Sequence, residues 1–117
     1  MPKQTSIETA AREEAHFKVL RAIDATRSLS QRELAKQLGI SLGKTNYCLQ
    51  ALLEKGWIKA KNFKNSKNKI AYSYLLTPKG IEQKSKLTLR FLDRKRAEYK
   101  ALQSEIEQLS KEVSEES

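Results

Sequence analysis

The sequence has few of the residues from which disulfides, metal sites and membrane spans are built. Its 117 residues include one cysteine and one histidine, too few for an internal disulfide or a clustered zinc site. No apolar run approaches the ~18 residues of a membrane span. The polar start MPKQTSIETA lacks the apolar region of a signal peptide. We therefore expect a cytoplasmic protein with no metal, no cofactor and no membrane partner.

Apolar residues are also scarce, at 38% of the chain against 32% charged residues. A chain of this size and composition can form one small hydrophobic core. Part of the chain is therefore expected to be solvated or to bury its apolar face only against a partner. The sequence contains no Ser, His and Asp arrangement, no Gly-rich phosphate loop and no HExxH motif. We predict that the protein is not an enzyme.

Positive charge is abundant and is concentrated in the middle of the chain. Lys and Arg number 23 against 14 acidic residues, for a net charge of +9. Residues 57–78 contain no carboxylate, and a phosphate backbone is the group best suited to neutralise such a one-signed run. This predicts double-stranded DNA as the partner, and the alternative is a soluble loop without a ligand. The lysines of this run are Lys59, Lys61, Lys64, Lys67 and Lys69.

Apolar spacing and capping residues predict three helices in the first half of the chain. Apolar residues three and four apart predict a helix over about 7–25. Ser30 and Glu33 form an S-x-x-E capping box, so a second, short helix is expected to begin there and to end at Gly39. Ser41 is suited to cap a third helix that ends at Gly56. The second and third helices are thus joined by a tight turn.

After Gly56 the pattern becomes that of extended chain. Residues 57–63 and 70–76 predict two strands of a hairpin, with the lysine-rich segment between them. Thr77 and Pro78 predict the start of a final helix that continues to about residue 114. About 36 residues at 1.5 Å each span ~54 Å, so we expect this helix to extend beyond a small domain.

The final helix carries a heptad pattern from Leu92 onward. β-branched residues at one seam position and leucines at the other favour a two-stranded parallel coiled coil, although Lys95 interrupts the seam. We predict a homodimer; the alternative is that this helix folds back on the first helix of its own chain. The expected dimer contacts are Leu92, Tyr99, Leu102, Ile106, Leu109 and Val113.

The order of these elements predicts a mainly α fold with a small β-hairpin, a winged helix-turn-helix followed by a long dimerisation helix. In such a domain the third helix enters the major groove of DNA. Its inward side is expected to consist of Thr45, Cys48, Leu49 and Leu52. The outward residues, which we predict to read bases, are Gly43, Lys44, Asn46, Tyr47 and Gln50. The alternative is an exposed polar face without a ligand.

Contacts with the DNA backbone are assigned to the two helix starts and the hairpin. Besides the five lysines, they are Ser30, Gln31, Arg32 and Ser41. The predicted domain limits are 7–77 for the DNA-binding domain and 78–114 for the coiled coil, with flexible ends at 1–6 and 115–117. A rival function is a protein–protein interaction module with incidental affinity for DNA.

Two segments of the sequence resemble the winged-helix regulators of the MarR type, and most closely the EPS-associated MarR-family transcriptional regulators. They are LSQRELAKQLGISLGKTNYCLQALLEKGWIK and NFKNSKNKIAYSYLLTPKGIEQK. The resemblance covers roughly residues 17–113. It implies a dimeric DNA-binding repressor or activator of exopolysaccharide genes. Larger MarR relatives enclose ligands next to a dimer region built from both termini; here one helix takes that place, so no small-molecule effector is evident.

Five further residues are not assigned a role in binding or catalysis. Cys48 lies on the inward stripe, where cysteine usually behaves as a small apolar residue rather than a redox sensor. Trp57, Tyr72 and Tyr74 are expected to fill the core rather than to stack on bases. His16 has no neighbours suited to a metal site, so a satisfied or solvated histidine is expected.

Overall fold

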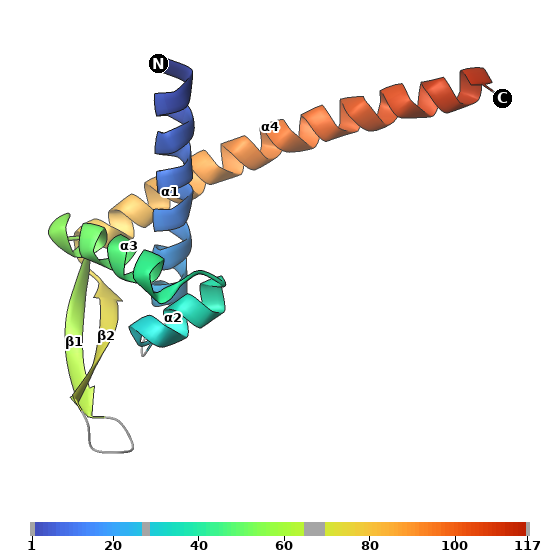
Figure 1. Ribbon diagram of the computed structural model, residues 1–117. Helices are drawn as coiled ribbons and strands as arrows, with labels where there is room; N and C mark the ends of the chain where they lie inside the picture. The colour runs from blue at the N-terminus through green and yellow to red at the C-terminus, as the bar shows by residue number, and fades with distance from the viewer. Residues whose placement is uncertain (1, 27–28, 65–69, 117) are drawn as a thin grey trace. The chain divides into compact units, whose positions relative to one another are not determined.

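The structure is a computed structural model, and it describes residues 2–26, 29–64 and 70–116 (Figure 1). The elements in chain order are α1 (Pro2–Ala25), α2 (Gln31–Leu38), α3 (Leu42–Glu54), β1 (Ile58–Lys64), β2 (Ile70–Leu76) and α4 (Pro78–Glu116). The chain divides into a compact unit, Met1–Leu87, and a second unit, Thr88–Ser117, which contains the remainder of α4. The predicted mainly α fold with one hairpin is confirmed.

Two helices extend beyond their predicted limits. Helix α1 begins at Pro2 rather than near Ile7, and α4 ends at Glu116 rather than near residue 114. Proline is well tolerated at the first helical position because it has no N–H to leave unpaired. Residues 2–6 and 115–116, for which we expected flexible ends, are therefore helical.

The core of the compact unit is built from the apolar sides of α1, α2 and α3 and from the base of the hairpin. Most apolar residues in the second half of α1 are buried, and they meet buried leucines of α2 and α3. The side chains least accessible to solvent are Leu20, Ile23, Leu34, Leu49, Leu52, Val19 and Thr45. This single core is what fixes α3 in place.

Two helix caps define the ends of α2, and the second of them begins the turn to α3. The Glu33 N–H donates to Ser30 Oγ at 3.2 Å, and the Ser30 N–H donates to Glu33 Oε1 at 3.4 Å, which completes the predicted capping box. Gly39 ends α2 with φ of 68°, a left-handed conformation that favours glycine. The turn is therefore determined by local side-chain and backbone preferences.

The hairpin is a two-stranded antiparallel sheet. Ile58 is paired with Leu76 at its base, and Lys64 with Ile70 at its far end. The connection at 65–69, which contains the predicted Lys67 and Lys69, lies outside the described residues. Two strands alone form a marginal sheet, so the hairpin depends on its base packing against the helices.

The start of α4 is held tightly against the start of the hairpin. Thr77 Oγ1 donates to the Gly56 carbonyl at 2.6 Å and accepts from the Gly80 N–H at 3.1 Å. The Thr77 N–H donates to the Trp57 carbonyl at 3.0 Å. A Cβ on Gly80 would lie 1.8 Å from that carbonyl oxygen. The close approach of α4 to Trp57 therefore requires glycine at position 80.

His16 is buried beside Trp57. Its side chain is 5% exposed, and its ring meets the Trp57 ring edge-on with centroids 6.3 Å apart. Burial, together with the positive charges of Lys55 and Arg12, lowers the pKa of His16 below 6.5. The neutral imidazole is therefore the form that the native core accommodates.

We expect the free energy of unfolding to fall as the pH drops below about 6.5, because the unfolded chain then binds a proton that native His16 resists. The slope can reach about 1.4 kcal/mol per pH unit until the native histidine is also protonated. Urea titrations of the wild type and of His16→Gln between about pH 7.5 and 5.5 measure it. His16 is the only histidine, so the variant should lose this slope; equal slopes would contradict the assignment.

Candidate nucleic-acid interface

Helix α3 has a buried side and an exposed side, as its sequence predicts. Thr45, Cys48, Leu49 and Leu52 are buried. The five predicted base-reading residues, Gly43, Lys44, Asn46, Tyr47 and Gln50, are exposed, and Tyr47 is 74% accessible. The exposed side therefore presents an ammonium group, two carboxamides and a phenol from two turns of one rigid helix.

The start of α3 is fixed by hydrogen bonds. Ser41 Oγ accepts from the Lys44 N–H at 3.1 Å, and Thr45 Oγ1 donates to the Ser41 carbonyl at 2.9 Å. Gln31 Nε2, at the start of α2, donates to the Leu42 carbonyl at 3.4 Å. The remaining N–H groups of the first turn have no partner within the helix and favour an anion such as a phosphate.

Three of the residues predicted to contact the DNA backbone are thus also structural. Ser30 and Ser41 cap helices, and Gln31 links α2 to α3. A serine hydroxyl that accepts from the backbone still has a hydrogen to donate to a phosphate. Arg32, in the first turn of α2, is exposed.

The hairpin presents lysines on β1. Lys59 and Lys61 are exposed and, two residues apart, lie on the same face of the strand. The Lys61 carbonyl accepts from Ser73 Oγ of β2 at 3.5 Å, a long hydrogen bond. Lys64 is the last residue of β1. Lys59 and Lys61 are therefore the two lysines of the predicted basic run that the structure shows to be exposed.

The prediction that both hairpin tyrosines are core residues is wrong for Tyr72. Tyr74 is 9% exposed, whereas Tyr72 is 54% exposed. The two side chains share one face of β2, but Tyr74 pairs with Ala60 nearer the base and Tyr72 with Asn62 farther out. Strand alternation predicts on which face of the hairpin a side chain lies, but it does not predict how far along the hairpin the core extends. The sequence therefore could not show that Tyr74 is buried and Tyr72 is exposed.

Cys48 is buried at the side of α3 that faces α1. Burial raises the pKa of its thiol, with a smaller opposing contribution from the charge of Lys44. A raised pKa disfavours the thiolate, which is the reactive form of cysteine. Cys48 therefore behaves as a small packing residue, as predicted. It borders a cavity of about 270 Å³ that also touches Ala15, Val19 and Ile40.

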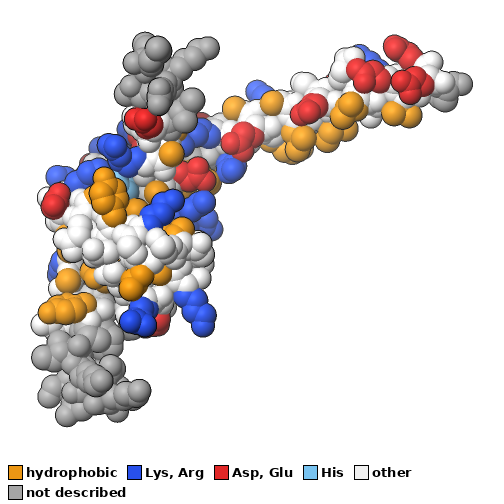
Figure 2. All heavy atoms as spheres, in the orientation of Figure 1, with side chains coloured by type: hydrophobic (Ala, Val, Ile, Leu, Met, Phe, Trp, Pro, Cys, Tyr) orange, Lys and Arg blue, Asp and Glu red, His pale blue; other side chains and the backbone are white. Residues whose placement is uncertain are grey.

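The second unit, taken by itself, is a helix with an uncovered apolar face. The six predicted seam residues are between 43% and 67% exposed. Figure 2 shows a row of hydrophobic side chains along one side of this part of α4. Lys95, the polar seam residue, lies 3.1 Å from Glu98 and stands over the Phe91 ring at 5.1 Å.

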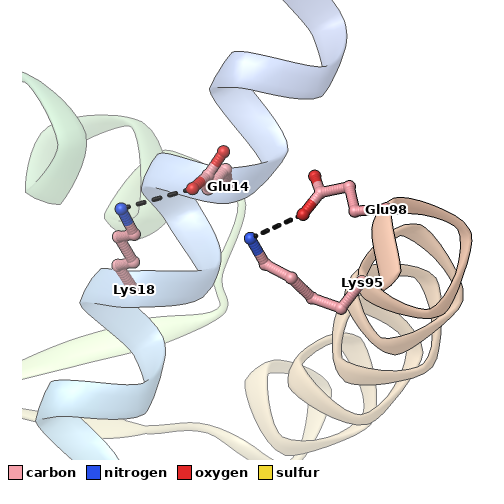
Figure 3. A network of polar contacts seen from close by, with 4 residues as sticks. All are labelled: Glu14, Lys18, Lys95 and Glu98. Carbon is pink, nitrogen blue, oxygen red and sulfur yellow. Dashed lines mark hydrogen bonds and ion pairs between the residues drawn. The ribbon is translucent and has the colours of Figure 1, made fainter. Parts of the chain in front are cut away.

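Several surface ion pairs lie within a single helix, whereas Lys84 of α4 pairs with Asp24 of α1 at 2.7 Å. Figure 3 shows the Lys95–Glu98 pair of α4 and, in α1, the Lys18–Glu14 pair at 3.3 Å. Such exposed pairs contribute only ~0.3–0.5 kcal/mol each to helix stability.

Among residues 2–26, 29–64 and 70–116, no helix is long and apolar enough to cross a membrane. The same residues contain no group of three or more His, Cys, Asp and Glu side chains placed to hold a metal ion.

Comparison with known proteins identifies the domain that contains this interface. Residues 12–59 match a family described as winged helix-turn-helix DNA-binding. This segment runs from the middle of α1 through α2 and α3 to the beginning of β1. No curated protein sequence matches the chain.

Solved structures show the same fold. MarR from E. coli, in its apo form, is 30% identical, with a TM-score of 0.56 over 62% of this chain and 53% of that one. The PcaV transcriptional regulator from Streptomyces coelicolor, solved with its natural ligand, is 18% identical, with a TM-score of 0.62 over 71% and 57%. MepR, a transcription regulator of the Staphylococcus aureus multidrug efflux pump MepA, is 17% identical, with a TM-score of 0.58 over 97% and 90%.

This chain thus spans just over half the length of MarR and of PcaV, at 53% and 57%. The match to the sequence family lies in the segment that contains α2 and α3, the two helices that form the candidate interface. The chain therefore contains a winged helix-turn-helix DNA-binding domain, built on the fold of the MarR-type regulators.

Proposed function

We propose that this protein is a homodimeric, sequence-specific DNA-binding regulator of transcription, in which the exposed side of α3 enters the major groove. The observation that carries the proposal is the division of α3 into a fully buried side and a side rich in hydrogen-bonding groups. A merely solvated helix face is usually rich in Glu and Lys, whereas this one has no carboxylate between Leu42 and Leu53.

Each exposed side chain of α3 has a suitable partner on DNA. Asn46 and Gln50, one helical turn apart, can each pair with adenine through two hydrogen bonds. Lys44 can bind guanine or a phosphate, and Tyr47 can contact a phosphate or a thymine methyl group. Gly43 has no atoms within 4 Å of where a Cβ would stand, so it leaves the approach of the helix to DNA open.

The helix starts and the hairpin supply contacts with the DNA backbone in this proposal. Ser30, Gln31, Arg32 and Ser41 lie at the first turns of α2 and α3, where N–H groups and hydroxyls bind phosphate. The lysines of the hairpin segment would bind the DNA backbone or the minor groove beside it. They are Lys59, Lys61, Lys64, Lys67 and Lys69. These contacts add affinity and set the position of α3.

Dimerisation through the seam of α4 would present two copies of α3 to a palindrome whose half-sites lie about one helical turn apart. As a transcriptional regulator it would act in the cytoplasm. The resemblance to EPS-associated MarR-family regulators supports exopolysaccharide genes as the targets.

Replacing a base-reading carboxamide should change which DNA sequence is preferred. For Asn46→Ala or Gln50→Ala we expect a loss of ~1–3 kcal/mol for the duplex selected by the wild type, and little loss for duplexes changed at the contacted base pair. The measurement is fluorescence anisotropy against a set of single-base variants of the selected site. Both residues are exposed, so folding should be unaffected.

The contrasting variant is Lys59→Gln with Lys61→Gln. It should weaken binding to all duplexes alike and reduce the slope of log K against log salt by about 0.9 for each lost phosphate contact. Gln108→Ala, on the second unit, is the control that should change neither quantity. Uniform weakening by Asn46→Ala and Gln50→Ala would contradict the role of these residues in base reading.

A further inference from the structure

The apolar face of the second unit is flanked by residues of unequal charge. The first seam position of the heptad is occupied by Leu92, Tyr99, Ile106 and Val113. Each of the last three residues is immediately preceded by a glutamate. These glutamates are Glu98, Glu105 and Glu112, and the opposite flank carries Arg96, Gln103 and Ser110. All six side chains are exposed. From Arg96 onward, one flank is therefore purely acidic, and the other contains no acidic residue.

This asymmetry distinguishes the two ways in which identical helices can pair. In a parallel coiled coil the first flank of one helix faces the second flank of its partner, one heptad further along. Glu98 would then meet Gln103 of the second copy, and Glu105 would meet Ser110, so that each carboxylate faces a hydrogen-bond donor. In an antiparallel pair like flanks face each other, and the glutamates of the two copies would be brought together.

Inside the seam, the residue types also favour two parallel strands. Ile106 and Val113 are β-branched at the first seam position, and Leu102 and Leu109 occupy the second. Lys95 is the exception, because parallel pairing places it in the same layer as its counterpart. Its ammonium group is already paired with Glu98 at 3.1 Å and lies 5.1 Å from the Phe91 ring. The charge is thus partly compensated within each chain.

We propose that Thr88–Glu116 of α4 pairs with the same segment of a second copy in parallel and in register, and that the acidic flank excludes the antiparallel arrangement. This inference rests on the proposed function, which requires a dimer, and it adds the charges of the two flanks to the seam pattern that favours parallel pairing. The segment is ~43 Å long at 1.5 Å per residue. Parallel pairing attaches both DNA-binding units to one end of the coil, whereas antiparallel pairing attaches them to opposite ends.

Disulfide formation between introduced cysteines tests the orientation. Val113→Cys is made in the full chain with Cys48→Ala, and also with the buried native Cys48 in case that replacement impairs folding. Parallel pairing brings the two introduced thiols into one layer, so the Val113→Cys protein should oxidise to a covalent dimer. Lys111→Cys, which faces away from the seam, is the control and should remain mostly monomeric on a denaturing gel, since bridging needs Cα atoms within about 7 Å.

A mixture of Leu92→Cys and Leu109→Cys proteins separates the other outcomes, because antiparallel pairing places the first seam position of one helix in one layer with the second seam position of its partner. If only the mixed disulfide forms, the helices are antiparallel, which overturns this inference and leaves the dimeric function intact. If sedimentation shows a dimer that no seam cysteine can cross-link, the dimer is formed elsewhere, and the inference is again wrong. If the protein is monomeric, the dimeric part of the proposed function fails as well, while DNA binding by α3 is judged by the anisotropy measurements.

Discussion

Gly80→Ala should destabilise the compact unit strongly. The new Cβ would lie 1.8 Å from the Trp57 carbonyl oxygen and 2.8 Å from its carbonyl carbon. Both atoms belong to the backbone, so neither can move aside as a flexible side chain would. Either the first turn of α4 or the start of the hairpin must shift, which would break the hydrogen bond of 3.0 Å from the Thr77 N–H to Trp57.

We expect this overpacking to lower the free energy of unfolding by about 3 kcal/mol, which corresponds to a loss of roughly 15 °C in Tm for a domain of this size. Thermal and urea unfolding followed by circular dichroism measure both quantities. Gly43→Ala is the matched control, because nothing lies within 4 Å of its Cβ position and its φ is not positive. In a helix that change should be neutral or stabilising by up to ~1 kcal/mol. Equal stability of the two variants would contradict the packing described at Gly80.

Leu102→Asp combined with Leu109→Asp should convert the protein to a monomer and remove most of its affinity for a palindromic site. Both leucines are exposed in the single chain and occupy one seam position of the heptad. Carboxylates there would have to be buried without partners in a dimer, at a cost that a short coil of about three heptads cannot offset. Loss of the second DNA-binding unit then lowers affinity by about 10²- to 10⁴-fold, because the two half-sites are no longer bound together.

Analytical ultracentrifugation gives the mass, and anisotropy with the selected duplex gives Kd. Ala97→Asp with Ser104→Asp adds the same charge on the side of α4 away from the seam, and it should leave both the dimer and the affinity nearly unchanged. Both control positions are exposed. A leucine variant that remains dimeric and binds DNA as the wild type does would show that α4 is not the dimer contact.

Local sequence signals predicted the helix-turn-helix well. The capping box of Ser30 and Glu33, the cap at Ser41 and the left-handed Gly39 each depend on residues only a few positions apart. The inward side of α3 followed from its apolar spacing, because a helix buries one stripe whatever the neighbouring elements are. These features therefore needed no knowledge of the tertiary structure.

Features that depend on distances between elements were not predictable in the same way. Gly80 is required because the carbonyl of Trp57, far earlier in the chain, lies against it, and sequence spacing alone carries no sign of that contact. The exposure of Tyr72 depends on how far the core reaches under the hairpin. The start of α1 at Pro2 was missed because residues 2–6 lack the apolar periodicity that marks a helix packed on a core.

Selection of bound sites from a pool of random duplexes, performed with the wild-type protein at two salt concentrations, tests most directly whether the exposed side of α3 reads bases. An inverted repeat with half-sites about 10–10.5 base pairs apart should be enriched, and more sharply at the higher salt concentration, where non-specific phosphate contacts weaken. Recovery of duplexes with no common sequence at either salt concentration would contradict base reading by α3.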